Sequence, residues 1–299
     1  MSDCRPVSYI IITHNRKQML LACLRTVTAQ VRQQPAEIIV VDNASDDGTA
    51  EAVGQEFPDA TLVCLESNDG PGAARNAGIE KARGDILIFI DDDAEFVSSD
   101  VSATVISRFA GEPDLAIVAF RIINAYTNQA MRYDFSGADL TLADQEFETS
   151  WFVGCGFALR KQALLSSGPF FVPFFYGAEE LDLCYRVLDA GFRVRYLPSV
   201  TVRHHKPAKR DVTARYLRYD VRSRFLVAWR NLPWWAALSY TTLWSGYLFL
   251  QAMKQGLLGS YLRGLLAGFA SLPLALGTRK VIKPDTVRRL RALHGRLFY

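Results

Sequence analysis

The sequence predicts an α/β fold in which a mostly parallel sheet is flanked by helices and followed by a helical extension. Through about residue 115, short apolar runs alternate with amphipathic segments, which is typical of a parallel sheet covered on both faces. Beyond residue 206 the chain becomes basic and apolar together. We therefore expect one α/β domain over residues 1–206 and a helical region over residues 207–299.

Four apolar runs near the start of the chain predict strands at residues 7–12, 37–41, 61–65 and 86–90. The first strand is followed by a helical pattern in which Leu20, Leu24 and Val27 share one face. Turn-forming residues 45–49 predict the start of a second helix, and the loop 68–72 precedes a third helix at 73–82.

The alternation weakens after residue 115. Strands are predicted at residues 115–122, 151–159, 193–197 and 200–202. A helix is predicted at residues 179–190, with Gly191 as its C-terminal cap. The chain contains no internal repeat and no low-complexity segment that would indicate a different architecture.

Charge is distributed unevenly along the chain, although the net charge is only +3. Residues 1–202 carry 16 basic and 28 acidic side chains, whereas residues 203–299 carry 18 basic and three acidic ones. The five cysteines lack metal-site spacing, and the N-terminus lacks a secretory signal pattern. These features favour a cytoplasmic protein whose C-terminal region meets an anionic partner.

The C-terminal region combines basic residues with long apolar runs. A helix at 212–229 places Arg215, Arg218 and Arg222 on one face, and apolar stretches follow at 232–253 and 257–276. Three arrangements remain open: a helical hairpin at a membrane interface, a soluble subdomain or homodimer interface, and membrane-spanning helices. Flanking cations and Trp/Tyr residues favour peripheral attachment to an anionic membrane surface. The interleaved apolar runs argue against binding nucleic acid.

Polar or acidic residues follow the ends of the first four predicted strands, where α/β sheets bind ligands. The acidic run Asp91, Asp92 and Asp93 is the strongest of these signals. Crowded carboxylates repel one another unless a cation joins them, and Asp91 and Asp93 project to one side of an extended chain. They therefore predict a divalent cation site, although a solvated acidic turn is the alternative.

Two further strand ends suggest a nucleotide ligand. Asp42 is suited to accept hydrogen bonds from a base or ribose, or else to cap its own turn. The segment 70–76 places a helix N-terminus and Arg75 at the same edge, which suits phosphate binding. It does not have the spacing of a dinucleotide-binding fingerprint.

A second acidic cluster, Glu179, Glu180 and Asp182, begins the predicted helix after the aromatic run 170–176. Acidic residues are favoured at helix starts in any protein. At the mouth of an aromatic cleft, however, a carboxylate can act as a general base. His204 follows the last strand and is placed to reach a metal or a diphosphate.

Taken together, these segments resemble the inverting family-2 glycosyltransferases of GT-A fold, in order and spacing, over about residues 5–206. The segments after residue 222 resemble the bacterial rhamnosyltransferase-like branch. The matching segments are 10–16 (IIITHNR), 40–49 (VVDNASDDGT), 72–78 (GAARNAG), 89–93 (FIDDD), 154–160 (GCGFALR), 179–186 (EELDLCYR), 202–204 (VRH), 222–224 (RSR) and 230–233 (RNLP).

The resemblance implies a UDP- or dTDP-linked sugar donor, a Mn²⁺ or Mg²⁺ ion, and a glycan or lipid-linked acceptor at the cytoplasmic face of the inner membrane. Glu180 occupies the position where the family usually has the catalytic Asp, with Glu179 as a second candidate and Asp182 nearby. The implied metal ligands are Asp91, Asp93 and His204. The implied donor-binding residues are Thr13, Asn15, Arg16, Asp42, Asn43, Asp46, Gly72, Arg75, Asn76, Asp91 and Asp92. The implied acceptor-binding residues are Trp151, Gly154, Cys155, Gly156 and Tyr176.

Two other function classes fit parts of the pattern. A nucleotidyltransferase-type enzyme acting on nucleotide sugars would need the metal site but neither the Glu180 cluster nor the basic C-terminal region. A non-catalytic nucleotide-sugar-binding subunit would be expected to have lost its acidic residues, whereas Asp42, Asp91, Asp93 and Glu180 are all present.

Overall fold

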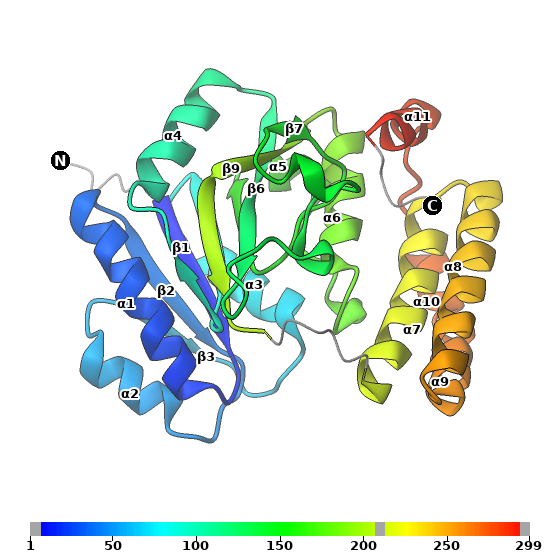
Figure 1. Cartoon of the computed structure of the whole chain (residues 1–299), viewed down its shortest axis with the longest axis horizontal. Helices are drawn as coiled ribbons and strands as arrows, with labels where there is room; N and C mark the ends of the chain where they lie inside the picture. The colour runs from blue at the N-terminus through cyan, green and yellow to red at the C-terminus, as the bar shows by residue number, and fades with distance from the viewer. Residues whose placement is uncertain (1–6, 207–212, 294–299) are drawn as a thin grey trace.

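The computed structural model describes residues 7–206 and 213–293. A central sheet carries helices on both faces, and the C-terminal helices pack beyond one of those faces (Figure 1). The strands are β1 (Val7–Thr13), β2 (Glu37–Asp42), β3 (Thr61–Cys64), β4 (Ile86–Asp91), β5 (Ala94–Phe96), β6 (Leu115–Asn124), β7 (Phe147–Glu148), β8 (Gly156–Arg160) and β9 (Arg193–His204).

The sheet confirms the predicted fold class. Its strand order is β3-β2-β1-β4-β8-β6-β9-β5, with β7 paired to β9. Strands β1 to β4 pair in parallel, β8 runs antiparallel to both β4 and β6, and β9 is parallel to β6. The carboxyl ends of β1, β2, β4, β6 and β9 therefore share one edge, and the opposed strand β8 begins there.

Helices cover the sheet because each presents an apolar face to it. One core cluster joins the sheet to α1, α2 and α4, and a second joins its other face to α3, α5 and α6. The helices are α1 (Lys17–Gln33), α2 (Thr49–Glu56), α3 (Pro71–Lys81), α4 (Val101–Gly111), α5 (Ala163–Ser167), α6 (Glu179–Asp189), α7 (Ala214–Asn231), α8 (Trp234–Lys254), α9 (Leu258–Ala270), α10 (Leu272–Gly277) and α11 (Pro284–Ala292).

The start of α3 is set by two residues with restricted backbones. Pro71 occupies the first turn, where its missing N–H has no intrahelical partner to lose. Gly70 has a φ of 88°, and a Cβ there would lie 2.0 Å from the carbonyl oxygen of Phe175. Only glycine therefore allows the loop before α3 to contact the loop before α6.

Several predicted elements differ from the observed ones. The strand predicted at 151–159 is confined to β8, because Gly154 packs against the side chains of Arg75 and Glu180. The two strands predicted around Pro198 form one strand, β9, which bulges between the pairs Phe120–Leu197 and Arg121–Thr201. The apolar stretch 257–276 divides into α9 and α10 near Pro273.

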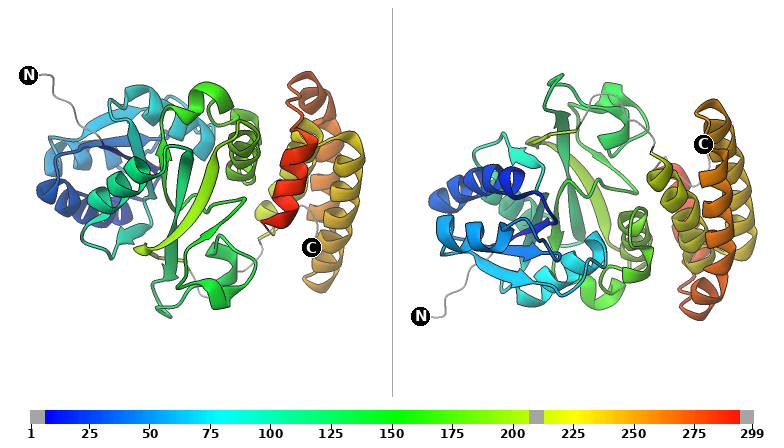
Figure 2. Two further views of the ribbon diagram at one scale, coloured as in Figure 1. Left: turned by 90° about the horizontal axis from the view of Figure 1, so that it is seen from above. Right: turned by 90° about the horizontal axis from the view of Figure 1, so that it is seen from below.

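The C-terminal helices form a layer on the α6 side of the molecule (Figure 2). Their apolar residues Leu226, Tyr240 and Leu290 belong to the same core cluster as the sheet residue Phe89. The helical region therefore shares a core with the α/β part. No helix in the described ranges combines the length and hydrophobicity needed to cross a membrane.

A buried charge network joins α6 to α7. The Asp182 carboxylate is fully buried and accepts hydrogen bonds from Arg186, Arg230 and Asn231. Both arginine side chains are themselves almost inaccessible to solvent. Because a buried cation is stable only when paired, this one carboxylate holds two cations inside the protein.

We expect Asp182→Asn to destabilise the protein strongly, since it leaves the buried Arg186 and Arg230 guanidiniums without a counter-charge. The expected loss in the free energy of unfolding is about 3–5 kcal/mol, measurable by chemical denaturation. Asp285→Asn is the control, because the ion pair of Asp285 with Arg288 is exposed and should contribute less than about 1 kcal/mol. Equal effects of the two substitutions would contradict a structural role for Asp182.

Candidate active site

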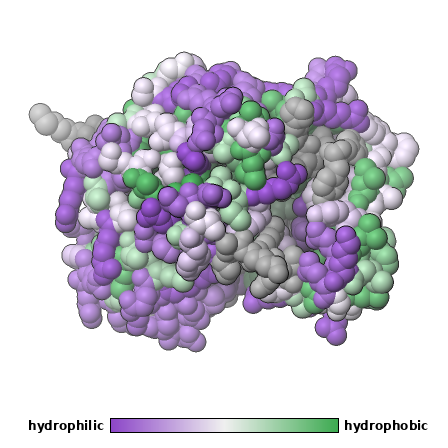
Figure 3. Space-filling view, viewed as in Figure 1, coloured by the Kyte–Doolittle hydropathy of each residue, from purple (hydrophilic) through white to green (hydrophobic). Residues whose placement is uncertain are grey.

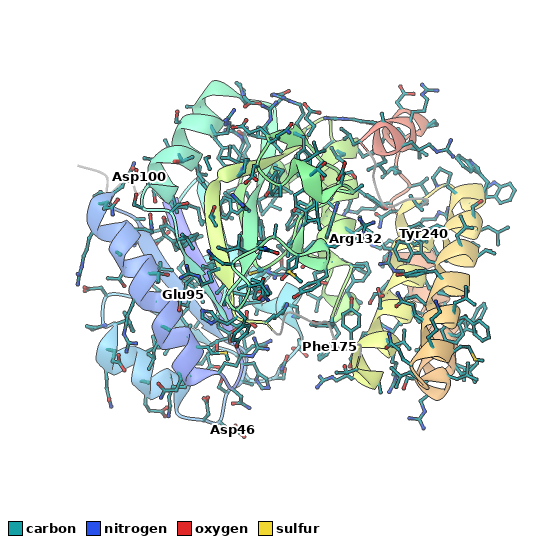
Figure 4. The ribbon with its side chains drawn as sticks, viewed as in Figure 1. Asp46, Glu95, Asp100, Arg132, Phe175 and Tyr240 are labelled. Carbon is teal, nitrogen blue, oxygen red and sulfur yellow. The ribbon has the colours of Figure 1, made fainter. Side chains whose placement is uncertain are left out.

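The candidate site lies at the sheet edge where the parallel strands end. Thr13, Asp42, Asp91 and His204 are the last residues of β1, β2, β4 and β9. Helices α3 and α6 begin at this edge and bring Arg75 and Glu180 toward it. In Figure 4 the labelled Asp46 and Phe175 mark two of the loops that border this edge.

The Arg75 guanidinium lies at the centre of the site. It is 3.4 Å from Asp91, 3.3 Å from Glu179 and 3.7 Å from Glu180, and it donates to the carbonyl oxygen of Gly154 at 3.2 Å. Burial alone would lower the pKa of Arg75. The surrounding carboxylates outweigh burial, so the pKa lies above its ordinary value. Arg75 is therefore a permanent cation that joins the start of α3 to the end of β4 and the start of α6.

Glu179 and Glu180 have different environments although they are adjacent. The side chain of Glu179 is 5% exposed and that of Glu180 is 21% exposed. Burial raises the pKa of Glu179 to about 8, the charge of Glu180 adds to this rise, and Arg75 opposes it. Burial therefore favours the protonated form of Glu179, and Glu180 is the more exposed of the two side chains.

Gly154 is required by the packing of this pair. A Cβ at Gly154 would lie 2.3 Å from Glu180 Oε1 and 2.5 Å from Arg75 Nη2. The loop before β8 therefore closes directly on the two charged side chains, with no room for a larger residue.

Asp93 and His204 form a second charged group at the edge. His204 Nε2 lies 3.2 Å from Asp93 Oδ1, and His204 Nδ1 is hydrogen-bonded to Asp134 Oδ2 at 2.7 Å. Burial raises the pKa of Asp93, but His204 and Arg16 outweigh it and hold the pKa at about 2. Burial lowers the pKa of His204, whereas Cys155, Asp134 and Asp93 raise it to about 12.

Asp134 and Lys206 are site residues that the sequence patterns did not reveal. Asp134 lies in a short 3₁₀ turn (Arg132–Asp134), within a segment that lacks strand or helix periodicity. Burial lowers the pKa of Lys206, but the charges of Asp134 and Asp93 raise it above its ordinary value. The only basis for expecting Asp134 was the general rule that a carboxylate often orients a histidine, here the one at the end of a strand.

The acidic run does not have the geometry that strand alternation predicted. Strand β4 ends at Asp91, and the chain turns at Asp92 and Asp93. Asp91 consequently faces Arg75, while Arg16 contacts both Asp92 and Asp93. Asp92 also accepts from Thr13 at 2.8 Å, and burial raises its pKa to about 6 against the opposing charge of Arg16.

The loop after β2 is held by its own polar side chains. Asp42 is buried and accepts from the backbone N–H of Ser45 at 2.9 Å, which is the capping role considered for it. Asn43 donates to Asn68 at 3.0 Å, and the Asn15 side chain accepts from the exposed Asp46 backbone at 2.8 Å. These contacts bring the loops after β1, β2 and β3 together.

Several residues expected in the site make their contacts within the protein core or between helices instead. The side-chain amide of Asn76 makes two hydrogen bonds to the backbone of Phe170, and buried Gly72 lies against the Phe170 side chain. Gly156 faces Val202 and Ile122 on the side of the core. Asp182, expected in the catalytic group, is enclosed between α6 and α7 and is paired there with Arg186 and Arg230.

The two expected acceptor aromatics border the site differently. Tyr176 is exposed and its ring contacts Tyr216 and Tyr219 of α7. Trp151 is half-buried in the loop before β8, and its backbone is hydrogen-bonded to Thr149. Cys155 is buried beside His204, and that burial raises its pKa to about 11.

Part of the expected metal set has the character of a cation site. Asp93 Oδ1 and His204 Nε2 are buried and face one another at 3.2 Å. The negative field that raises the pKa of His204 would also attract a divalent cation. In the described chain no three His, Cys, Asp or Glu side chains gather closely enough to hold a metal ion, so Asp91 is not joined to this pair.

Together, the mixed sheet, the acidic strand ends and the carboxylates at the start of α6 define a GT-A-type α/β fold. The family model described as "Glycosyl transferase family 2" matches residues 8–168, which is more than half of the chain. The chain belongs to glycosyl transferase family 2.

The chain is similar to several curated proteins. It is 27% identical to the glycosyltransferase AglE of Haloferax volcanii, over 65% of each chain. It is 31% identical to the pre-mycofactocin glycosyltransferase of Mycobacterium tuberculosis, over 61% of this chain and 40% of that one. It is 23% identical to the O-antigen chain rhamnosyltransferase RfbN of Salmonella typhimurium, over 70% of each. The match therefore spans less than two thirds of the length of the first two relatives.

Two solved structures share the fold. GalNAc-T7, solved with UDP, GalNAc and Mn²⁺, has a TM-score of 0.63 and 14% identity, covering 91% of this chain and 58% of that one. The mannosyltransferase PcManGT of Pyrobaculum calidifontis, solved with GDP-Man and Mn²⁺, has a TM-score of 0.57 and 20% identity, covering 97% of this chain and 76% of that one. At these identities the likeness shows the GT-A fold.

We expect Glu179→Gln to change how stability depends on pH. Glu179 has a folded-state pKa raised to about 8, so the unfolded chain releases this proton first as the pH rises. The free energy of unfolding of the wild type should therefore fall between about pH 4.5 and 8, by up to about 1.4 kcal/mol per pH unit.

The amide cannot ionise, so Glu179→Gln should gain stability relative to the wild type as the pH rises through this window. Denaturant titrations of both proteins across the range measure the difference. Glu80→Gln, an exposed change on α3, is the control. A wild-type-minus-variant difference that does not vary with pH would show that Glu179 is already ionised in the folded protein.

Proposed function

We propose that the protein is a metal-dependent inverting glycosyltransferase that moves a sugar from a UDP- or dTDP-linked donor to a hydroxyl of a glycan or lipid-linked acceptor. The observation that carries this proposal is the contact of Arg75 with both Asp91 and Glu180. This contact supports Glu180, from α6, as a candidate base near the acidic end of β4. A nucleotidyltransferase would not require such a base.

The donor would lie across the edge of β1 to β4. The loops after β1, β2 and β3 surround Asp42, whose second carboxylate oxygen remains to accept from a base or ribose. Arg16 and Arg75 supply positive charge at the two sides of the acidic run, where a diphosphate would be placed. The related fold of PcManGT in complex with GDP-Man and Mn²⁺ supports this placement.

Asp93 and His204 would hold a Mn²⁺ or Mg²⁺ ion, with the remaining ligands coming from the donor phosphates. When bound, such an ion stabilises the negative charge that develops on the departing nucleoside diphosphate. The chain's own part is to fix the imidazole. Asp134 holds His204 Nδ1 so that Nε2 is directed at Asp93, an arrangement common around metal-binding histidines.

Glu180 would act as the general base. Glu180 is the more exposed of the two side chains, whereas burial favours the protonated form of Glu179. Glu180 would take the proton from the acceptor hydroxyl as its oxygen forms a bond to the anomeric carbon. The bond from that carbon to the diphosphate oxygen breaks on the opposite side, so the configuration inverts.

Residues 1–206 would thus bind donor and acceptor, and residues 207–299 would hold the enzyme at an anionic membrane surface, on the cytoplasmic face. The acceptor would enter between the loop before β8 and the aromatic group formed by Tyr176, Tyr216 and Tyr219. Sugars stack on such rings, which suits a glycan acceptor. The exposed apolar side chains of α8 and α9, next to α7, suit the membrane surface. We also propose a homodimer as one oligomeric state, which a measurement of mass in solution would test.

The donor site is tested by thermal unfolding with UDP, dTDP or GDP, each with and without Mn²⁺. We expect one nucleotide to raise the melting temperature in a Mn²⁺-dependent way, and Asp93→Asn to lose this increase, because its carboxylate faces His204. Asp59→Asn, an exposed change far from the edge, should keep the full response. A normal response in Asp93→Asn would remove Asp93 from the metal site.

The base is tested with the nucleotide sugar that stabilises the protein, by following release of nucleoside diphosphate with water or glycan as acceptor. Glu180→Gln should lower kcat by roughly 10²–10⁴-fold, the usual contribution of a general base, while nucleotide binding stays unchanged. Glu80→Gln serves again as the matched control. If Glu179→Gln loses turnover and Glu180→Gln does not, the roles of the two residues are exchanged.

A further inference from the structure

The exposed hydrophobic surface of the molecule is concentrated on its C-terminal helices. Fifteen of the 21 large hydrophobic side chains that are exposed in the described ranges lie between residues 234 and 281. Leu266 and Phe269 of α9 are 69% and 54% exposed. Figure 3 shows hydrophobic side chains gathered over α8 and α9, with hydrophilic ones beside them. Apolar surface gathered in this way indicates an interaction site.

A groove at the border of this surface contains two arginines. It has a volume of about 470 Å³ and is lined by Arg218 of α7 and by Arg263, Leu266, Ala267 and Ala270 of α9. Both arginines are exposed, and neither has an ion-pair or hydrogen-bond partner among residues 7–206 and 213–293. The groove therefore offers two available cations next to an apolar wall.

Most neighbouring cations are already used within the protein. Arg222 donates to the carbonyl oxygens of Pro173 and Phe174, Arg224 contacts Asp220 and Trp244, and Arg230 contacts Asp182. Fewer positive charges are therefore available to a partner than the net charge of this region suggests. Arg218 and Arg263 are different because nothing in the described part of the chain neutralises them.

The two arginines are brought together by close packing of α9 on α7. A Cβ at Gly264 would lie 2.8 Å from the Arg218 carbonyl oxygen, and one at Gly268 would lie 2.9 Å from the Phe225 ring. These glycines let the helix backbones approach, and Arg263 precedes the first of them directly. The backbone positions that carry the two arginines are therefore held close together by helix packing.

We propose that this groove binds the phosphate of an anionic phospholipid, with Leu266 and Phe269 inserted among the acyl chains beside it. The proposal rests on the membrane attachment proposed above and gives it a specific ligand and site. Guanidiniums bind phosphate through paired hydrogen bonds, and their aliphatic stems lie comfortably against apolar surface. A lipid provides both the anion and the apolar neighbour that the groove combines, whereas free phosphate provides only the anion.

The test is flotation of the full chain with vesicles of phosphatidylcholine alone or mixed with phosphatidylglycerol. We expect the wild type to bind the mixed vesicles more strongly, and R218Q/R263Q to lose roughly 25-fold in partitioning to them, since each cation near an anionic surface contributes about a factor of five. Binding of this variant to neutral vesicles should not change.

The matched control is R25Q/R32Q, which removes two positive charges from exposed positions of α1 in the α/β domain. It should bind as the wild type does, so a loss specific to R218Q/R263Q reports the groove and not net charge. L266N/F269N should weaken binding to both kinds of vesicle. Thermal unfolding of each variant checks that the fold is retained.

Four outcomes would overturn the proposal. Equal binding by R218Q/R263Q and R25Q/R32Q would leave only non-specific attraction. Competition by inorganic phosphate at low concentration would indicate a free-anion site. A lipid-free dimer that R218Q/R263Q dissociates would assign the groove to a second copy. If the wild type binds no vesicles, both the groove and the membrane attachment fail, whereas the transferase proposal is decided separately by Asp93→Asn and Glu180→Gln.

Discussion

The candidate site depends on the burial of one guanidinium among carboxylates that would otherwise repel one another. Asp91, Glu179 and Glu180 come from two elements nearly 90 residues apart in the chain, and Arg75 comes from a third. An arginine guanidinium keeps its proton at any ordinary pH, so its charge is constant. It holds the three carboxylates together and, with Glu180, limits how close the loop before β8 can approach.

The C-terminal helices contribute to this arrangement as well as to the outer surface. Arg230 and Asn231 bind Asp182 on α6, and Arg222 holds the carbonyl oxygens of the loop that precedes α6. The start of α6, where Glu179 and Glu180 lie, is therefore supported from behind by α7. Removing this region would take away part of the shared core, including Tyr240, and would also release the helix that carries the proposed base.

The sequence predicted the features that arise from local patterns. Strands β1 to β4, helices α1, α3 and α6, and the acidic strand ends follow from periodicity and from residues adjacent in the chain. The features it missed depend on distant contacts. Asp134 contacts His204, which is 70 positions away in the chain. In the sequence Asp182 is indistinguishable from any acidic residue at a helix start, and only the fold shows that Arg230 lies beside it. The geometry of the acidic run was misjudged because the chain turns at Asp92 and Asp93 instead of continuing extended, which no residue pattern indicates.

The close approach at Gly70 has a consequence for how this protein can diversify. The loop before α3 and the loop before α6 touch through backbone atoms, with no side chain between them that could be trimmed or enlarged. In the proposed enzyme these loops border the donor and the acceptor. A change in the backbone of one must be matched in the other, so chimaeras with relatives should exchange both loops together, as one inherited block.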